Sequence, residues 1–425
     1  MKKIFVSIGL AASAAGLSSA FAQGMESAAP KLWNVSGTLR GFYDDNYNSS
    51  NNKQSSWGLE VSPSVSANLD LQQTDLGMRY TFGMYYYFDR GTSDSSPIDY
   101  THQADVWLDH AFDETMKLNV TDSFVVAQDP KLIDGGAITR VGGNNVVNHA
   151  QINLTKDWTR QFSTATHYGN NLVVYSDSHL QTPSNPGLYP SQAAVLNRIE
   201  QNIGTDFQWQ FEKETMGFIG YNFSWTRYTG SALIQPSTSV PLYYSDARNN
   251  NTHYGYVGVQ HEFSPNLSAT ARGGVSYIDM YNDPVGASSS VAPYADISAT
   301  YTFTPGSYLQ GGFTQNMNAT DVVAPGANGH LTQYQESSVG YLNLTHKFDA
   351  KLTGSLVGQY AYSQYKDGAY ANQADNTVSA GVNLNYQINS HFSADAGYNF
   401  DELFSDISGR DYSRNRVYIG LGANY

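Results

Sequence analysis

The chain has 425 residues, no cysteine and a formal net charge of −14 at pH 7. The absence of cysteine excludes disulfides, thiolate metal sites and cysteine nucleophiles, and the acidity disfavours a nucleic-acid partner. Beyond the amino terminus, no apolar stretch approaches the ~20 residues that a membrane helix needs, so any membrane crossing must use strands.

The first residues are typical of a Sec-type signal peptide. Lys2 and Lys3 form the charged region, an apolar region runs from Ile4 to Leu17, and Ala20-Phe21-Ala22 is an A-x-A cleavage site. The sequence therefore predicts an exported protein from which residues 1–22 are removed. Residues 23–32 would then form a short periplasmic segment ahead of a single domain at 33–425.

Eighteen short segments of alternating apolar and polar residues fill this domain, and the gaps between them alternate between short and long. The alternation predicts strands at 33–46, 56–71, 76–90, 100–112, 116–127, 146–158, 161–174, 197–211, 215–230, 250–263, 267–281, 291–303, 307–318, 335–348, 352–365, 376–388, 391–405 and 415–425. We expect an all-β fold: a transmembrane antiparallel up-and-down β-barrel of about 18 strands, with 16 as the alternative. Eight short turns would be periplasmic, and nine longer loops extracellular.

The short gaps share one formula, in which an aromatic residue precedes two to four turn residues and a new strand. The aromatic residues are Phe112, Phe211, Phe263, Phe303 and Phe348. Outer-membrane barrels carry aromatic girdles where the strands leave the lipid. The formula therefore predicts a girdle at the periplasmic end.

The two faces of each strand differ in polarity. Leu59 and Val61 are typical of the apolar parity, which we assign to lipid, and Glu60 and Ser62 are typical of the polar parity, which we assign to the lumen. Asp122 is an exception because it shares the apolar parity. A β-bulge beside Asp122 would turn it inward, and a position near the outer strand end would lower the cost of exposing it to lipid.

The final strand resembles the carboxy-terminal signal that barrel-assembly machinery reads. Its apolar face consists of Val417, Ile419, Leu421 and the terminal Tyr425. This resemblance implies assembly machinery and periplasmic chaperones as partners during biogenesis. The alternative is that any amphipathic strand closing a barrel has this pattern.

Eighteen strands leave a lumen wide enough for an aqueous channel unless loops or side chains fill it. We therefore expect passive diffusion of small hydrophilic solutes. The candidate pore-lining residues are Arg40, Glu60, Arg79, Asp105, Asp206, Arg272, Asp296 and Asp395. Basic and acidic side chains are nearly balanced on the lumen parity, which predicts weak ion selectivity.

Two further features of the lumen are candidates for function. Four aromatic residues on the inward parity could stack on sugar rings, or could pack loop bases and the outer girdle instead; they are Phe42, Tyr85, Tyr87 and Trp107. The third outer loop, at about 128–145, could fold inward as a constriction, and the longer loops near 175–196 and 231–249 are rivals for a plug. Its charged residues are Asp129, Lys131, Asp134 and Arg140.

No catalytic motif is present, and we predict no enzyme, no cofactor and no metal centre. Asp44-Asp45-Asn46 begins like a calcium loop, but Ser49 and Ser55 stand where an EF-hand needs Gly and Glu. An EF-hand is therefore excluded, although a looser surface calcium site is left open.

Three stretches resemble the Putative β-barrel porin-2 family: Val61-Ser-Pro-Ser-Val65, Tyr85-Tyr-Tyr-Phe-Asp-Arg90 and Leu118-Asn-Val-Thr-Asp-Ser-Phe124. The likeness is clearest over about 35–130. The family includes outer-membrane barrels similar to those encoded with exopolysaccharide-export genes, so the resemblance implies either a porin-like channel or an export-associated barrel. It transfers no site residue.

The expected function is thus a porin-like channel in the outer membrane, surrounded by outer-membrane lipid. The alternative is a plugged barrel that serves as an exopolysaccharide-export component or as a surface-binding, adhesive scaffold. The sequence leaves both the monomer and a homo-oligomer open.

Overall fold

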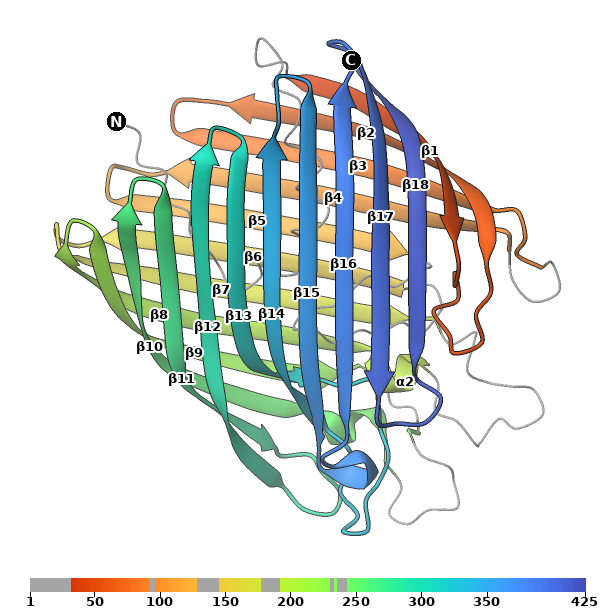
Figure 1. The fold of residues 1–425 in the computed structure, drawn as a ribbon. Coiled ribbons are helices and arrows are strands. Elements are labelled where there is room, and N and C mark those ends of the chain that lie inside the picture. Colours follow the sequence, from red (N-terminus) through yellow and green to blue (C-terminus); the bar gives the residue numbers. More distant parts are fainter. Residues whose placement is uncertain (1–31, 92–95, 128–144, 177–191, 230–232, 235–242) are drawn as a thin grey trace.

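The structure is a computed structural model that describes residues 32–91, 96–127, 145–176, 192–229, 233–234 and 243–425. These residues form one closed antiparallel barrel of 18 strands (Figure 1). The barrel closes because β1 pairs with β18 as well as with β2. The strands are β1 (Trp33–Asp44), β2 (Ser56–Asp70), β3 (Thr74–Tyr87), β4 (Ile98–Ala111), β5 (Met116–Ala127), β6 (Asn145–Asp157), β7 (Phe162–Tyr175), β8 (Arg198–Glu212), β9 (Thr215–Tyr228), β10 (Asn250–Ser264), β11 (Leu267–Met280), β12 (Ser288–Thr304), β13 (Ser307–Ala319), β14 (Tyr334–Lys347), β15 (Leu352–Lys366), β16 (Ala374–Gln387), β17 (Phe392–Ser405) and β18 (Tyr412–Asn424).

The predicted barrel is confirmed with 18 strands rather than 16, and each predicted strand end lies within three residues of the observed one. Eight connections have two to four residues, whereas the other nine have at least six. Figure 1 shows the short connections and the carboxy terminus at one end of the barrel and the longer loops at the other. Gly306, in a two-residue turn, has φ +80°, a conformation that glycine adopts without strain.

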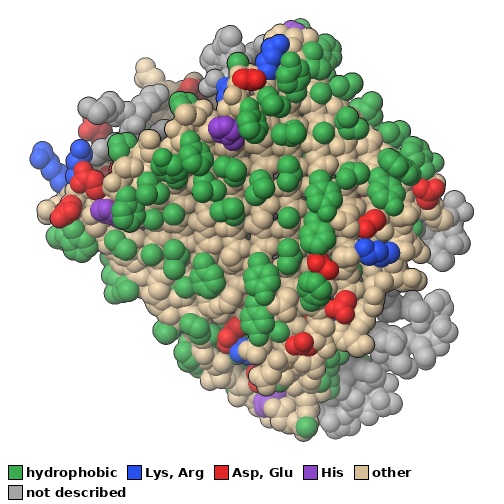
Figure 2. Space-filling view, viewed as in Figure 1, with side chains coloured by type: hydrophobic (Ala, Val, Ile, Leu, Met, Phe, Trp, Pro, Cys, Tyr) green, Lys and Arg blue, Asp and Glu red, His purple; other side chains and the backbone are tan. Residues whose placement is uncertain are grey.

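The outer wall is an apolar band, as the parity of the strands predicts. Ile203 is 47% exposed and Val257 is 61% exposed, although both lie in mid-strand regions. Figure 2 shows apolar side chains across the wall, with most charged side chains near the two rims. Such a band fits a bilayer, because lipid offers no partner for charged groups. No helix in the described ranges is long and apolar enough to cross a membrane.

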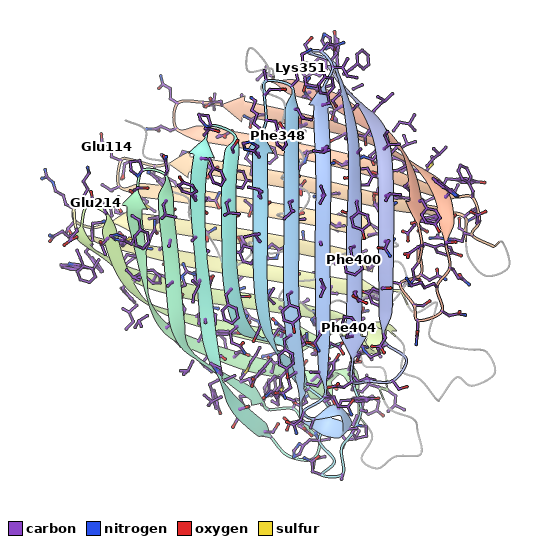
Figure 3. All side chains as sticks on the ribbon, in the orientation of Figure 1. Glu114, Glu214, Phe348, Lys351, Phe400 and Phe404 are labelled. Atoms are coloured by element: carbon purple, nitrogen blue, oxygen red, sulfur yellow. The ribbon has the colours of Figure 1, made fainter. Side chains whose placement is uncertain are left out.

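The aromatic girdle at the short turns has a repeated packing geometry. In three turns the phenylalanine ring packs edge-to-face against a histidine two residues earlier, with ring centroids 4.5–4.7 Å apart. The pairs are His110–Phe112, His261–Phe263 and His346–Phe348. Phe348 and Lys351 lie together at one such turn, while Phe400 and Phe404 lie on the wall nearer the loop end (Figure 3). Residues that suit a membrane interface therefore mark both rims.

The suggested β-bulge beside Asp122 is wrong. β5 keeps an unbroken register with β4 and with β6, so Asp122 stays on the lipid parity. Asn148, on the neighbouring strand, donates a hydrogen bond of 2.6 Å from Nδ2 to Asp122 Oδ1. Since this bond satisfies the carboxylate in place, no change of register is needed.

Within the described parts of the longer loops there are three short helices: α2 (Gln192–Leu196), η2 (Ser245–Arg248) and η3 (Gly368–Tyr370). Of these, α2 packs against the end of β7, and η2 against β9. Parts of the outer loops therefore contact the barrel wall.

Candidate functional site

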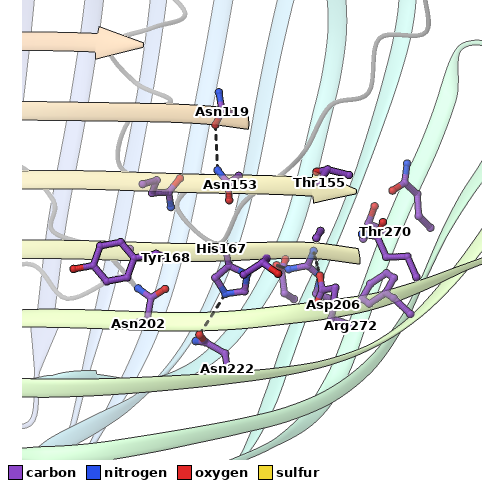
Figure 4. A pocket seen from close by; sticks show the side chains of 18 of the residues that line it. Asn119, Asn153, Thr155, His167, Tyr168, Asn202, Asp206, Asn222, Thr270 and Arg272 are labelled. Atoms are coloured by element: carbon purple, nitrogen blue, oxygen red, sulfur yellow. Dashed lines mark hydrogen bonds and ion pairs between the residues drawn. The ribbon is translucent and has the colours of Figure 1, made fainter. Parts of the chain in front are cut away.

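A cavity of about 2000 Å³ occupies the lumen beside strands β2–β14. It begins at the short turns, where Gln72 and Pro265 line it, and ends near Leu196, Thr320 and Gln333 of the outer loops. Nearly half of its lining residues are Asn, Gln, Ser or Thr, and ten carboxylates face five Lys or Arg side chains. Figure 4 shows part of this polar wall. The cavity can therefore hold water and hydrophilic solutes.

The eight predicted pore-lining charges pair with one another in three groups. Near the seam of the barrel, Arg40 lies 3.1 Å from Glu60 and 2.7 Å from Asp395. Arg79 lies 2.9 Å from Asp105. These five side chains lie outside the lining of this cavity, and their ion pairs link nearby strands of the wall.

The third group does line the cavity. Arg272 lies between Asp206, at 3.7 Å, and Asp296, at 4.0 Å. Tyr256 donates a hydrogen bond of 2.6 Å to Asp206. Parity placed all eight charges on the inward face, but which of them line this cavity depends on how neighbouring side chains fill the lumen.

The four aromatic residues proposed for sugar stacking lie away from the cavity. Phe42 and Tyr87 are 1% and 2% exposed, and their ring centroids are 5.3 Å apart. The guanidinium of Arg416 lies 4.1 Å from the Phe42 ring centroid, and that of Arg90 lies 3.9 Å from the Tyr87 centroid. These two rings therefore pack against neighbours and present no open face.

Tyr85 and Trp107 are half-buried. Trp107 lies over Gly77, where an added Cβ would be 2.0 Å from the indole Cζ2. The glycine thus makes room for the ring to lie flat on the wall. Sugar stacking remains a prediction for these two residues alone.

In the stretch that begins like a calcium loop, Asp44-Asp45-Asn46, the first carboxylate binds an arginine. Both carboxylate oxygens of Asp44 accept hydrogen bonds from Arg414, the shortest being 2.6 Å from Nη2 to Oδ2. Among the described residues, no group of three His, Asp or Glu side chains is placed to hold a metal ion.

The outer end of the lumen contains a packed layer of loop residues. Val173 and Tyr175, on the inward parity of β7, join residues of three loops in one buried apolar cluster. The loop members include Val195, Tyr243 and Leu331. The described parts of loops 176–197 and 229–249 thus pack against the inward face of β7, and their role as a plug stays a prediction. Asp129, Lys131, Asp134 and Arg140 of the third loop lie outside the described residues, so their role remains a prediction.

Arg248 joins three of these loops. Its side chain is fully buried and donates hydrogen bonds of 2.7 Å to the carbonyl of Val195 and 2.6 Å to that of Thr320. The guanidinium also lies 4.5 Å from the ring centroid of Tyr228. Burial lowers the pKa of Arg248. No sequence motif marked this residue, because its role depends on carbonyls far away in the chain.

Loop 320–333 contacts several other outer loops. Arg410 of the last loop lies 3.1 Å from Asp321. Burial works against the charged form of Arg410, but nearby carboxylates outweigh it and raise the pKa of the guanidinium. His330 Nδ1 lies 2.9 Å from Asp283, and Tyr243 donates a hydrogen bond to the carbonyl of Gly329. The loop is therefore the common partner in the outer layer.

Replacing Arg248 with alanine should loosen this layer without opening the barrel. Two buried carbonyls would lose their donors, at a cost of about 1–3 kcal/mol for each unsatisfied group. We expect amides near Val195 and Thr320 to exchange hydrogen faster, measured by mass spectrometry. Arg160→Ala, at an exposed periplasmic turn, is the control and should change neither segment. Unchanged exchange in R248A would contradict the bridging role.

A closed antiparallel barrel with an apolar outer band and a polar lumen is the architecture of an outer-membrane β-barrel. By sequence, part of the chain matches a known family: residues 244–425 match the model of the family Putative beta-barrel porin 2. The resemblance to this family that the sequence suggested is confirmed for residues 244–425. The expected location of the likeness, 35–130, is wrong, because the match lies in the second half of the chain.

Several solved structures resemble the fold. The outer membrane protein opdK from Pseudomonas aeruginosa is 10% identical, with a TM-score of 0.44 over 92% of this chain and 99% of its own. A BenF-like porin from Pseudomonas fluorescens Pf-5 is 12% identical, with a TM-score of 0.45 over 92% and 99%. OccAB4 from Acinetobacter baumannii is 12% identical, with a TM-score of 0.41 over 93% and 99%. No curated protein matches the sequence. Identity this low leaves the solute of this chain to be argued from its own lumen.

Proposed function

We propose that this chain is an outer-membrane channel for the passive diffusion of small hydrophilic solutes, with a modest preference for cations. The observation that carries the proposal is the polar cavity of about 2000 Å³, which extends from the periplasmic turns to the outer loop layer. The excess of carboxylates over cationic side chains in its wall would enrich cations locally. Because the wall charges are mixed and partly paired, the preference is modest.

Single-channel conductance of refolded residues 23–425 in a planar bilayer tests the proposal. Steady conductance would support a diffusion channel. A folded barrel that never conducts would contradict it and favour the second candidate, a plugged barrel acting in exopolysaccharide export or surface binding. The interlocked outer loops are the observation that favours this second candidate.

The periplasmic mouth should set much of the cation preference. Asp70, Asp75 and Asp109 are cross-strand neighbours on three adjacent strands, and all three line the cavity. Replacing all three with asparagine should shift the reversal potential in a potassium chloride gradient toward zero, because the local potential that attracts cations falls.

A matched control removes the same amount of charge from the same end of the barrel. Asp113, Glu114 and Asp349 lie on periplasmic turns and do not line the cavity. Their neutral variants (Asp→Asn, Glu→Gln) should leave the reversal potential close to that of the wild type. An equal shift in both triple variants would mean that overall charge, not the cavity wall, determines selectivity.

We also propose that residues 1–22 act as a removable Sec signal peptide, ahead of a short periplasmic segment at 23–32 and one barrel domain at 33–425. Val417, Ile419, Leu421 and Tyr425 would engage the assembly machinery. Their exposed side chains on the outer face of β18 support this role.

A further inference from the structure

Strands β3–β9 carry a row of polar side chains that face one another across the sheet. Each member from β3 to β7 is opposite the next in the strand register, and Gly204 of β8 lies opposite both His167 and the last member, Asn222. The members of this polar row are Asp75, Asp109, Asn119, Asn153, His167 and Asn222. On β8 the row passes through Gly204, where an added Cβ would be 2.6 Å from His167 Cε1. The glycine lets the imidazole reach across β8 to Asn222.

Hydrogen bonds connect neighbours within the row. Asn119 Nδ2 donates to Asp109 at 2.9 Å, and Asn153 Nδ2 donates to Asn119 at 3.1 Å. His167 Nε2 lies 3.3 Å from Asn222 Oδ1 (Figure 4). All six side chains line the cavity. The bonds fix the direction of each amide, so the row presents an ordered set of donors and acceptors to the lumen.

The row rises through the barrel. Asp75 is one residue from the periplasmic end of β3, Asn119 is three residues from that end of β5, and His167 is five from that end of β7. Asn222 is seven residues from the periplasmic end of β9. At about 3.3 Å per residue, this difference of six residues corresponds to roughly 20 Å along the strands. The row therefore leads from the periplasmic mouth to the middle of the wall.

Its chemistry changes along the way. At the mouth the row presents the carboxylates of Asp75 and Asp109, which favour ammonium groups, although Lys117 also lines the cavity there. The higher part of the row presents amides and an imidazole, which both donate and accept hydrogen bonds. Adjacent hydroxyl groups of a sugar ring likewise donate and accept hydrogen bonds, so they match this part of the row. The opposite wall differs, since Asn383 is buried and donates to Tyr418 Oη at 2.8 Å.

We propose that the polar row binds amine-bearing carbohydrates, meaning amino sugars and their short oligomers, as they pass through the lumen. This inference rests on the proposed channel function, since the solute must enter the cavity. Ammonium groups would bind at Asp75 and Asp109, and hydroxyl groups would exchange hydrogen bonds with Asn119, Asn153 and Asn222. Sugar acids would be disfavoured by the carboxylates.

The test is block of single-channel current by trimers of glucosamine, a neutral hexose and galacturonic acid. In the wild type we expect the apparent affinity to fall in that order, with the first and last differing on the order of tenfold or more. In N119A/N153A, loss of two hydrogen-bonding side chains should weaken block by glucosamine trimer on the order of tenfold. N385A is the matched control: glucosamine trimer should block its current as it blocks that of the wild type, because Asn385 shares the inward parity but does not line the cavity.

The outcomes separate the two proposals. If N119A/N153A conducts ions as the wild type does but glucosamine trimer no longer blocks its current, both the channel function and carbohydrate binding by the row are supported. Equal block by the three trimers, or unchanged block in N119A/N153A, would overturn the assignment of the row while leaving the channel intact. If the wild type never conducts, the channel proposal fails, and calorimetric titration of the detergent-refolded barrel with glucosamine trimer then tests binding by the row alone.

Discussion

Replacing Arg414 with alanine is expected to lower the free energy of unfolding by about 3–5 kcal/mol, the usual cost of stranding one partner of a buried ion pair. Arg414 lies on β18 and is 5% exposed, while Asp44 lies on β1 and is fully buried. The guanidinium donates hydrogen bonds to both carboxylate oxygens. In R414A the carboxylate would keep its burial and lose its main counter-charge.

Urea unfolding in lipid vesicles, followed by the loss of heat-modifiable mobility on gels, measures this effect. Asp44→Asn in the R414A background is the control, because it removes the stranded charge. The double variant should recover part of the lost stability. If R414A and the wild type unfold at the same urea concentration, the pair does not stabilise the barrel.

The second large effect is expected for Ile203→Arg. Ile203 is on the lipid face of β8, five residues from one strand end and nine from the other, so its side chain lies well within the apolar band. An arginine near the bilayer midplane costs roughly 2–4 kcal/mol in a transmembrane barrel. We expect a reduced yield of folded barrel on refolding into vesicles.

Asn202→Arg, one position earlier on the same strand, is the matched control. Asn202 lines the cavity, where water can solvate the new charge. This variant should refold close to the wild-type yield and shift selectivity toward anions. Equal refolding of I203R and N202R would contradict the assignment of the two faces.

Much of the fold could be predicted from the sequence because the strands and short turns of a barrel depend on residues that are close together in the chain. The period of two separates Ile203 from Asn202, and the turn formula at Phe263 and Phe348 locates the periplasmic rim. Asp122 shows the limit of this reasoning. Its parity suggested a bulge, but Asn148, 26 residues away, satisfies the carboxylate without one.

The site was less predictable because it depends on contacts between distant residues. Parity placed Arg40 and Arg272 alike on the inward face, yet only Arg272 lines the cavity. The bridging role of Arg248 was not predicted, because it depends on two backbone carbonyls from other loops. The polar row was also missed, although the short turn between β4 and β5 could have aligned Asp109 with Asn119.

The ion pairs at the seam have a consequence for how the barrel is completed. Arg40 of β1 binds Asp395 of β17, and Asp44 of β1 binds Arg414 of β18, across 355 and 370 residues of chain. In an unclosed sheet Asp44, Asp395 and Arg414 lack these partners and Arg40 keeps only Glu60 of β2, because the first and last strands are far apart. Their pairing energy is released only when the two edges meet. Closure is therefore cooperative, and a sheet stopped one hairpin short keeps its end charges in water, a form that quality-control proteases could distinguish from the finished barrel.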